Sequence, residues 1–374
     1  MNLELILKVL KLRQAALRVT AGKLTRGLDA TRDDERLYDM HAYHSAHTGR
    51  FAGRLLNVHN LPRGVKVDVE KVLNSPRKLE DIDAEAERLG VSADDVIASL
   101  IRPCLYGVPG LVRCDYSAIE PRVIAWLAGE ERMLNIYRAG QQPYMDMGRQ
   151  LYGRPIEKGT PEYNVSKAVV IGSSYGLSHY KLGPYCKAMG VSLGDLDPAL
   201  VIKTYRETYP AIPKLWRRLD QGTKLAVRTG QDYTLDRLYI FMEGDCLCIK
   251  LPSGRVLRYR SARIEMEVPA YARFLSVDVG EKPALKYTGP RGDKTLYGGL
   301  LAENVTQAVA RDILCDALVR CEAAGLNPVL HVHDEIVCET LDLPALEHIM
   351  SIGPAWAAGL PIAVEGVLAE RFGK

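Results

Sequence analysis

Apolar positions follow two different periods along this chain. Residues 119–127 show the spacing of a helix, with apolar side chains at Ile119, Val123, Ile124 and Leu127. Short apolar runs at 111–114 and 329–332 are typical of buried strands, and a further run at 336–338 follows the second after a tight polar turn. The pattern therefore predicts an α+β protein that contains at least one hairpin.

The rest of the chain divides by composition. Residues 64–100 are polar and charged, with a helical stretch at 80–88, and indicate a surface insertion. Residues 130–230 are rich in helical pattern, and residues 231–300 alternate apolar and polar around turns, as strands do. The C-terminal part predicts, in order, a helix over 300–324, the hairpin at 328–340, a helix over 343–359 and a strand over 362–368.

Two acids occupy the ends of apolar runs, where the chain turns. Asp115 follows the run at 111–114, and Asp334 lies in the predicted hairpin turn, next to Glu335. Phosphoryl transfer develops charge on the attacking and leaving oxygens, which two divalent ions about 3.5–4 Å apart can stabilise. Mg²⁺ prefers oxygen ligands such as carboxylates. The two acids on adjacent strands therefore suit magnesium-dependent nucleotidyl transfer.

A cation for the phosphates is also available. Lys167, Ile171 and Tyr175 are spaced by four residues, so they share one face if the helix runs through all three. Lys167 could bind a triphosphate as a point charge. Each signal has a plainer interpretation taken alone: a turn, a solvated loop, or a lysine beside core residues. The three together and in this order favour the nucleotidyl-transfer hypothesis.

Longer stretches carry a resemblance to a known family. Residues 115–130, 167–176 and 333–335 resemble motifs A, B and C of family A DNA polymerases, in the form common to phage-type members. Supporting resemblances lie at 47–54 with 57–63, at 142–144 with 151–153, and at 297–299 with 303–307 and 310–312. The resemblance covers roughly residues 40–374. It implies a right-hand polymerase with an antiparallel palm sheet, helical fingers and a shortened thumb.

The resemblance also implies roles for single residues. Asp115 and Asp334 would hold two Mg²⁺ ions, which Mn²⁺ can replace, with the Tyr116 carbonyl as a further ligand and Glu335 near the primer end. Lys167 would bind the incoming triphosphate and act as general acid. The other implied nucleotide-binding residues are Glu120, which excludes ribonucleotides and is held by a hydrogen bond to Tyr175, and Tyr144, Ile171 and Tyr175 itself.

Three residues would contact primer–template DNA without reading its sequence: Arg50, Gln307 and His333. Arg50 could instead be a surface arginine, and Gln307 a helix-surface amide. The chain also departs from the family pattern. Tyr163 stands where an arginine usually binds the triphosphate, Ile171 where an aromatic ring usually packs on the sugar, and Pro121 where leucine or alanine is usual. We therefore expect weaker triphosphate binding, which a steady-state KM measurement tests.

The resemblance divides the chain into four parts. Residues 1–63 would form a partial thumb and its link to the palm, 64–129 the surface insertion and first palm segment, 130–230 the fingers, and 231–374 the palm. Residues 3–27 predict one helix with a leucine-rich stripe, either a thumb remnant or a docking helix for a separately encoded exonuclease or processivity partner. No second carboxylate cluster suggests a 3′–5′ exonuclease, so we expect none in this chain.

Composition constrains the function less than the motifs do. The net charge of +3 neither demands nor excludes DNA. The eight cysteines show no C-x₂-C pair and are expected to be reduced and mostly buried. Neither a membrane span nor a signal peptide is recognisable, so we expect a cytoplasmic protein of a bacterium or of a phage-infected host.

Three functions remain to be compared. The leading hypothesis is DNA-templated DNA synthesis, in which dNTPs are added to a primer 3′ end. The second is a weakly active or inactive DNA-binding or assembly subunit of the same fold, in which the Tyr163 and Ile171 changes matter. The third is an enzyme that makes RNA or copies RNA. Glu120 argues against the use of ribonucleotides as substrates. Primer extension with different nucleotides and templates separates them.

Overall fold

The computed structural model describes residues 20–62, 65–275 and 277–373. Residues 3–19 of the predicted N-terminal helix lie outside these ranges, and its remainder lies in α2 (Thr20–Ala30). The chain forms two compact units, each with its own core. Unit 1 comprises Met1–Asp115, Leu318–Met350 and Val364–Lys374, and unit 2 comprises Tyr116–Ala317 and Ser351–Ala363.

Unit 1 is built on a four-stranded sheet with strand order β11-β12-β3-β13. Both β11 and β3 are antiparallel to β12. The bounds of the four strands are β3 (Tyr106–Tyr116), β11 (Pro328–Val332), β12 (Glu335–Cys338) and β13 (Val364–Arg371). The two expected strand segments and their hairpin are thereby confirmed. The closing strand begins two residues later than expected, and β3 is longer than its apolar run because it continues past Pro109 and Gly110.

Both faces of this sheet are covered. One face packs against the segment that contains β1 (His41–Ala42), β2 (Ala52–Gly53) and the 3₁₀ helix η1 (Val58–Asn60). The shared core there contains Met40, Leu56, Val58, Leu61, Ile101, Leu111, Val332, Val337 and Phe372. On the other face lie Cys114 and Cys338, with Cys321 from the last turns of α14 (Gly298–Ala323) hydrogen-bonded to Cys338. Burial on both sides explains why residues 111–114 read as a continuous apolar run.

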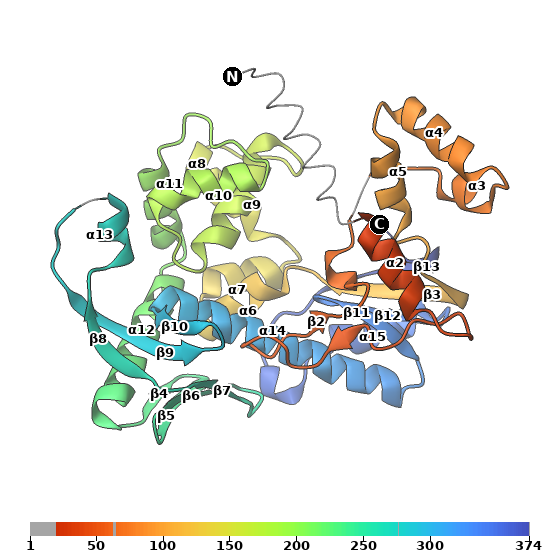
Figure 1. Ribbon diagram of the computed structural model, residues 1–374. Helices are drawn as coiled ribbons and strands as arrows, with labels where there is room; N and C mark the ends of the chain where they lie inside the picture. Colours follow the sequence, from red (N-terminus) through yellow and green to blue (C-terminus); the bar gives the residue numbers. More distant parts are fainter. Residues whose placement is uncertain (1–19, 63–64, 276, 374) are drawn as a thin grey trace, which may run out of the picture. The chain divides into compact units, whose positions relative to one another are not determined.

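The polar stretch at 64–100 folds into a small helical module of its own (orange in Figure 1). It contains α3 (Val69–Asn74), α4 (Lys78–Leu89) and α5 (Ala93–Leu100). Val72, Ala86, Val96 and Leu100 form its core, and a capping box at Ser92 starts α5. The expected surface insertion therefore has a packed interior, which its polar composition concealed.

Unit 2 begins with helices and continues with strands. Its helices are α6 (Ile119–Ala128), α7 (Glu131–Arg138), α8 (Pro143–Tyr152), α9 (Pro161–Ser173), α10 (His179–Ala188), α11 (Pro198–Thr208), α12 (Ala211–Thr229) and α13 (Ala270–Leu275), with most of α14. One sheet has the order β4-β5-β6-β7 and another the order β10-β9-β8. The strands are β4 (Tyr233–Leu235), β5 (Leu238–Glu243), β6 (Cys246–Lys250), β7 (Val256–Tyr259), β8 (Arg263–Glu267), β9 (Lys282–Gly289) and β10 (Gly292–Leu296).

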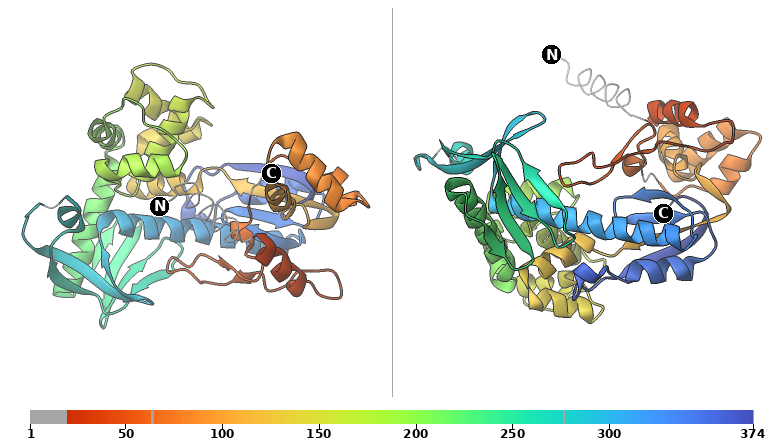
Figure 2. Two further views of the ribbon diagram at one scale, coloured as in Figure 1. Left: turned by 45° about the horizontal axis from the view of Figure 1, so that its top comes forward. Right: turned by 90° about the horizontal axis from the view of Figure 1, so that it is seen from below.

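Helix α12 connects the helical and strand-rich parts of unit 2. It contacts α6 on one side and strands of both sheets on the other (Figures 1 and 2). The helix-rich stretch at 130–230 and the strands at 231–300 are thus as expected, and so is the long helix now seen as α14. The strands at 231–300, however, form sheets separate from the one that carries Asp115 and Asp334.

The helix expected over 343–359 is shorter than the pattern suggested. It is α15 (Leu343–Ser351), and a separate 3₁₀ turn, η2 (Ala355–Ala357), follows it. Gly353 and Pro354 separate the two, because proline disfavours a helical conformation in the residue before it and cannot continue the hydrogen-bond ladder. All eight cysteines are free thiols and five of them are buried, as expected.

Close backbone packing at the start of α14 generates a stability prediction. A Cβ added at Gly298 would lie 2.1 Å from the backbone oxygen of Trp216 in α12. We expect Gly298→Ala to lower the free energy of unfolding by about 2 kcal/mol, because the backbone must move to admit the methyl group. Urea denaturation measures the change.

The matched control is Gly22→Ala in α2, where an added Cβ meets nothing within 4 Å. There we expect no loss of stability, and a gain of up to about 1 kcal/mol from helix propensity. Equal midpoints for Gly298→Ala and the wild type would show that α14 and α12 do not pack this closely.

Candidate active site

The register of two strands brings the predicted acids of unit 1 together. Asp115 near the end of β3 is the direct cross-strand partner of Glu335, the first residue of β12. Paired residues point to the same face of a sheet, with Cα atoms about 4.5–5.5 Å apart. Asp334 immediately precedes Glu335 in the turn of the β11–β12 hairpin. Two segments more than 200 residues apart in sequence therefore supply three carboxyl groups to one end of one sheet.

The hairpin turn itself is tight. Val332 pairs with Glu335, so only His333 and Asp334 form the loop. His333 has a φ of 57°, a left-handed conformation that a side chain adopts at some cost. The predicted hairpin is thus confirmed, with Asp334 at its tip and Glu335 already in the strand.

A buried arginine accompanies these acids. Nη1 of Arg113 lies 3.3 Å from Oε1 of Glu335, and the two side chains are only 11% and 9% exposed. Arg113 and Asp115 are two residues apart on β3, so both lie on the same face as Glu335. Arg113 therefore neutralises Glu335. Nothing in the sequence pattern singled it out beyond an arginine within an apolar run.

Two histidines of the segment before the sheet also reach the hairpin. His41 hydrogen-bonds the backbone oxygen of His331, and His59 accepts from the backbone N–H of His333. Burial lowers the pKa of His59 to about 4, so its ring is neutral near pH 7 and its Nδ1 can accept this hydrogen bond. His59 lay within a stretch that resembled the family, but no periodicity or spacing pointed to its contact.

In unit 2 the candidate nucleotide-binding residues lie on and just beyond α9. Lys167 is exposed on this helix, and Ile171 follows one turn later. The helix ends at Ser173, so Tyr175 is not on the shared helical face that its spacing suggested. Trp216 donates to the Ser174 carbonyl, and Gly176 has a φ of 81°, which together turn the chain out of the helix.

One predicted contact in unit 2 is confirmed. The Tyr175 hydroxyl donates a hydrogen bond of 2.9 Å to Oε2 of Glu120, in the first turn of α6. The Tyr175 carbonyl faces Gly299 at the start of α14, where a Cβ would lie 2.3 Å away. The glycine pair at 298–299 thus allows the backbone of α14 to approach this tyrosine closely.

Two aromatic residues of unit 2, Tyr144 and Tyr163, are buried and contact each other. Tyr144 in α8 and Tyr163 in α9 are 5% and 8% exposed, and their rings meet edge to face with centroids 5.8 Å apart. Burial raises the pKa of Tyr144 to about 12. Tyr163, at the position of the expected arginine, therefore packs α9 against α8.

The chain directly after Asp115 is held by backbone contacts within unit 2. Arg122, 3% exposed, donates to the carbonyls of Ser117 and Pro361, and the Ser117 N–H donates to the Ala363 carbonyl. Burial lowers the pKa of the Arg122 guanidinium. These contacts fix the turn at residues 117–118, which carries the chain from Tyr116 into α6.

The remaining candidate residues lie in two places. Arg50 is half-buried in the loop between β1 and β2 of unit 1. Gln307 is half-buried on α14 in unit 2, where its side chain donates to Glu303 with a distance of 3.1 Å. His333, in the hairpin turn, is exposed.

The donor set at the end of the β3–β12 pair suits a hard divalent cation. It offers carboxylate oxygens from Asp115 and Asp334, while Glu335 is already paired with Arg113. Mg²⁺ typically takes one or two carboxylates and completes its shell with water and phosphate. The residues present therefore fit magnesium by their chemistry.

Comparison with known proteins identifies the family. The sequence profile described as DNA polymerase family A matches residues 2–233, more than half of the chain. The chain belongs to DNA polymerase family A. The family assignment confirms the resemblance drawn from motifs A, B and C. No helix among the described residues is both long and apolar enough to cross a membrane.

Individual relatives in family A extend the comparison. The DNA polymerase of Bacillus phage SP02 is 33% identical over all of this chain and 58% of its own length. The DNA polymerase of Mycobacterium phage D29 is 27% identical over 68% of this chain and 33% of its own. This chain thus spans little more than half the length of SP02 polymerase and a third of D29 polymerase.

A solved structure shows the same fold. The polymerase domain of Pol1 from M. smegmatis, in complex with DNA primer-template and dNTP, superimposes with a TM-score of 0.59. The match covers 94% of this chain and 51% of that one at 16% identity. The right-hand family A fold expected from the motifs is therefore confirmed, and so is the α+β class.

The Arg113–Glu335 pair gives a testable prediction within unit 1. Replacing Arg113 by methionine leaves a buried carboxylate without its partner, which we expect to destabilise the protein by about 3 kcal/mol. The double variant Arg113→Met with Glu335→Gln should recover much of that loss, since no buried charge then remains. Chemical denaturation of the four proteins in this double-mutant cycle measures the coupling.

The opposite outcome is also clear. If the loss of stability in the double variant equals the sum of the losses in Arg113→Met and Glu335→Gln, the two side chains act independently and Glu335 is not neutralised by Arg113.

Proposed function

We propose that this chain is a DNA-templated DNA polymerase that adds dNTPs to a primer 3′ end by nucleotidyl transfer with two Mg²⁺ ions. The observation that carries the proposal is the β3–β12 register, which places Asp115 opposite Glu335 with Asp334 in the adjoining turn. Family membership and the whole-chain similarity to the DNA polymerase of phage SP02 support it. The primer-template and dNTP bound to M. smegmatis Pol1 supply the substrate class.

The carboxylates of unit 1 bind the ions in this proposal. Asp115 and Asp334 are the metal ligands, and the Tyr116 carbonyl adds a further oxygen. Two bound Mg²⁺ ions supply activation of the primer 3′-hydroxyl and stabilisation of the charge on the transferred phosphate. Glu335, paired with Arg113, keeps the sheet end ordered near the primer terminus and adds no unbalanced charge.

The residues of unit 2 bind and select the nucleotide. Lys167 contacts the triphosphate as an exposed cation and donates a proton toward the pyrophosphate leaving group. Glu120, held by Tyr175, crowds the sugar 2′ position. Ile171 lies beside the sugar, and Tyr175 stacks at the templating position. Tyr144 stabilises α9 through its contact with Tyr163.

Arg50, Gln307 and His333 contact the primer–template duplex at its backbone and minor groove in this proposal. The protein acts in the bacterial or phage-infected cytoplasm, where such DNA is found. A separately encoded exonuclease or processivity factor is a candidate partner.

Primer extension tests the proposal directly. We expect the wild type to extend a DNA primer on a DNA template with Mg²⁺ and dNTPs, and Asp115→Ala and Asp334→Ala to lower the rate by at least about 1,000-fold, because the metal ligands are lost. The control is Asp94→Ala, an exposed acid in α5 of the same unit, which should extend normally. Quenched-flow assays on primer–template give the rates.

A wild type that binds primer–template and extends nothing would instead support a DNA-binding or assembly subunit of the same fold. Incorporation of rNTPs, or extension on RNA, at rates equal to those with dNTPs on DNA would support the RNA-making or RNA-copying alternative.

Sugar selection is tested through the Tyr175–Glu120 hydrogen bond. We expect Glu120→Ala to reduce discrimination against ribonucleotides by at least about tenfold, and Tyr175→Phe by a few-fold, since loss of one such hydrogen bond costs about 1 kcal/mol. The ratio of kcat/KM for dNTP and rNTP measures this. Unchanged ratios in both variants would rule out a role of Glu120 in sugar selection.

A further inference from the structure

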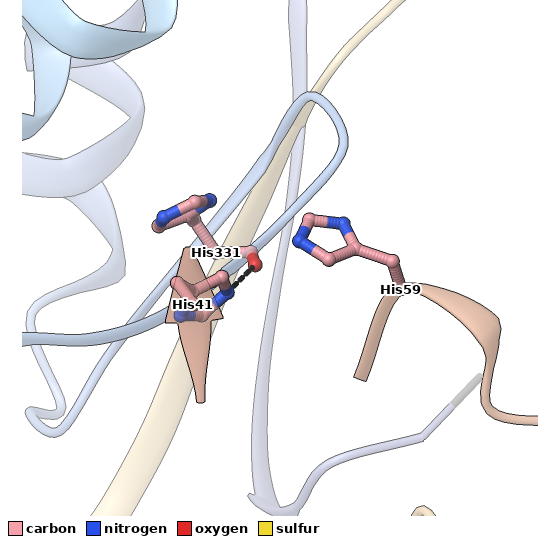
Figure 3. A group of neighbouring side chains, drawn as sticks. All are labelled: His41, His59 and His331. Atoms are coloured by element: carbon pink, nitrogen blue, oxygen red, sulfur yellow. Dashed lines mark hydrogen bonds between the residues drawn. The ribbon is translucent and has the colours of Figure 1, made fainter. Parts of the chain in front are cut away.

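Four of the eight histidines gather around the hairpin that carries Asp334. His331 and His333 belong to the hairpin itself, while His41 and His59 come from the preceding segment of unit 1. Figure 3 shows the rings of His41 and His331 next to each other, and the ring of His59 pointing toward them from a separate segment. None of the four belongs to the carboxylate set assigned to the metal ions, so their presence there needs a separate explanation.

His59 and His333 hold each other by two hydrogen bonds. The backbone N–H of His333 donates to Nδ1 of His59, and Nε2 of His333 donates to the His59 carbonyl, each at 3.2 Å. These two hydrogen bonds form the histidine clasp. The residue that they hold, His333, has a φ of 57° and directly precedes Asp334. A left-handed non-glycine residue costs about 1–2 kcal/mol and persists only where its surroundings hold it. The histidine clasp therefore stabilises the left-handed conformation of His333.

His41 fixes the strand that leads into the turn. Its Nε2 donates a hydrogen bond of 2.7 Å to the carbonyl of His331, which Figure 3 draws as a dashed line. Its ring also stacks on the His331 ring, with centroids 3.9 Å apart and planes 21° from parallel. Backbone atoms on both sides of Val332 are thus bonded to side chains of the preceding segment.

The backbone of that segment is itself tightly packed. His41 in β1 is the cross-strand partner of Gly53 in β2. A Cβ at Gly53 would lie 2.1 Å from Oδ1 of Asn57, the residue directly before η1, which has a φ of 49°. Because Gly53 has no side chain, η1 can lie close to β2 and present His59 beside His41.

We infer that His59 and His41 are positioning residues that hold the His333–Asp334 turn in the conformation in which Asp334 binds metal. This inference rests on the proposed function, since it takes Asp334 as a metal ligand. Residues that orient metal ligands typically contribute about 10–100-fold to metal affinity or activity. The two histidines act through backbone atoms of the hairpin and touch neither substrate nor ion.

A metal ion held by the histidines themselves is the alternative, because nitrogen atoms of His41, His59 and His331 lie within 4.8 Å of one another. The hydrogen bonds argue against it. Nδ1 of His59 accepts the hydrogen bond from the His333 N–H, so the neutral ring carries its proton on Nε2 and has no lone pair left for an ion. The neutral His41 ring likewise carries its proton on Nε2, which donates to the His331 carbonyl. The stacked rings of His41 and His331 also cannot both direct a lone pair at one ion. The histidines are therefore arranged to hold the backbone of the hairpin and not to bind an ion.

Substitutions that keep or remove single atoms test the inference. Asn places an amide oxygen near the position of Nδ1, so His59→Asn preserves the acceptor for the His333 N–H, and His59→Ala removes it. Gln places an amide nitrogen near the position of Nε2, so His41→Gln preserves the donor to the His331 carbonyl, and His41→Ala removes it. His348→Ala, at an exposed histidine of α15, is the matched control.

The first readout is Mn²⁺ affinity at the carboxylates, measured by electron paramagnetic resonance on the whole chain without DNA or nucleotide, with Asp334→Ala defining its loss. We expect His59→Ala to weaken binding about tenfold, with a smaller effect for His41→Ala. His59→Asn, His41→Gln and His348→Ala should bind as the wild type does. Hydrogen exchange at the His333 amide should be faster in His59→Ala and normal in His59→Asn.

The second readout is primer extension per active enzyme, from burst amplitudes. There His59→Ala should lower kcat about tenfold and raise the Mg²⁺ concentration for half-maximal rate, with the dNTP KM unchanged. A general loss of folding would lower the burst amplitude and the thermal midpoint instead. Wild-type metal affinity and hydrogen exchange in His59→Ala would overturn the inference, and so would an Asn variant as impaired as the Ala variant.

The two proposals fail differently. If the wild type binds Mn²⁺ through Asp334 but extends no primer, the proposed function is wrong. The role of the histidine clasp is then still tested by the Mn²⁺ affinity and by hydrogen exchange at the His333 amide. If Zn²⁺ binds tightly by calorimetry and is lost in His59→Asn as well as His59→Ala, the cluster is a metal site, since an amide is not a zinc ligand. That result would overturn the positioning role.

Discussion

The pairing of β12 with β3 is the constraint on which the candidate site depends. Side chains alternate between the faces of a strand, so a slip of one residue would turn Glu335 away from Asp115 and bury the wrong set. Apolar residues on both faces resist such a slip: Val337 packs into the core with Val58 and Leu111, while Cys338 lies on the opposite face. The same packing that stabilises unit 1 thus sets which carboxylates meet.

The constraint brings the Arg113–Glu335 pair and, in part, the His59 ring into the interior of unit 1. Glu335 is neutralised by Arg113, and burial, together with the nearby His333 and His41, lowers the pKa of His59 to about 4, so its ring is uncharged near pH 7. Unpaired charges at this depth would cost several kcal/mol each. At this end of the sheet, Asp115 and Asp334 are the two acids that the proposed function assigns to cations.

The sequence predicted local elements and missed long-range contacts. The helix at 119–127, the hairpin at 328–340 and the Tyr175–Glu120 hydrogen bond follow from periodicity or from family resemblance, and all three are present. The end of α9 before Tyr175 involves the Trp216–Ser174 hydrogen bond and Gly176, and the break after α15 involves Gly353 and Pro354. A periodic pattern of apolar residues does not predict either effect. Arg113, His41 and His59 carry no such pattern, because their roles arise only when distant segments pack together.

The division of the chain into two units separates the proposed roles in a useful way. The boundary falls between Asp115 and Tyr116, so both carboxylate ligands belong to unit 1, while Lys167, Glu120 and Tyr175 belong to unit 2. Each unit has its own core, and contacts such as the histidine clasp and the Tyr175–Glu120 hydrogen bond lie within one unit. Changes that loosen the clasp should therefore act on metal affinity, and changes on α9 on nucleotide affinity. Sites that share no partners usually contribute additively, so departures from additivity between the two sets would measure how far metal and nucleotide binding are coupled.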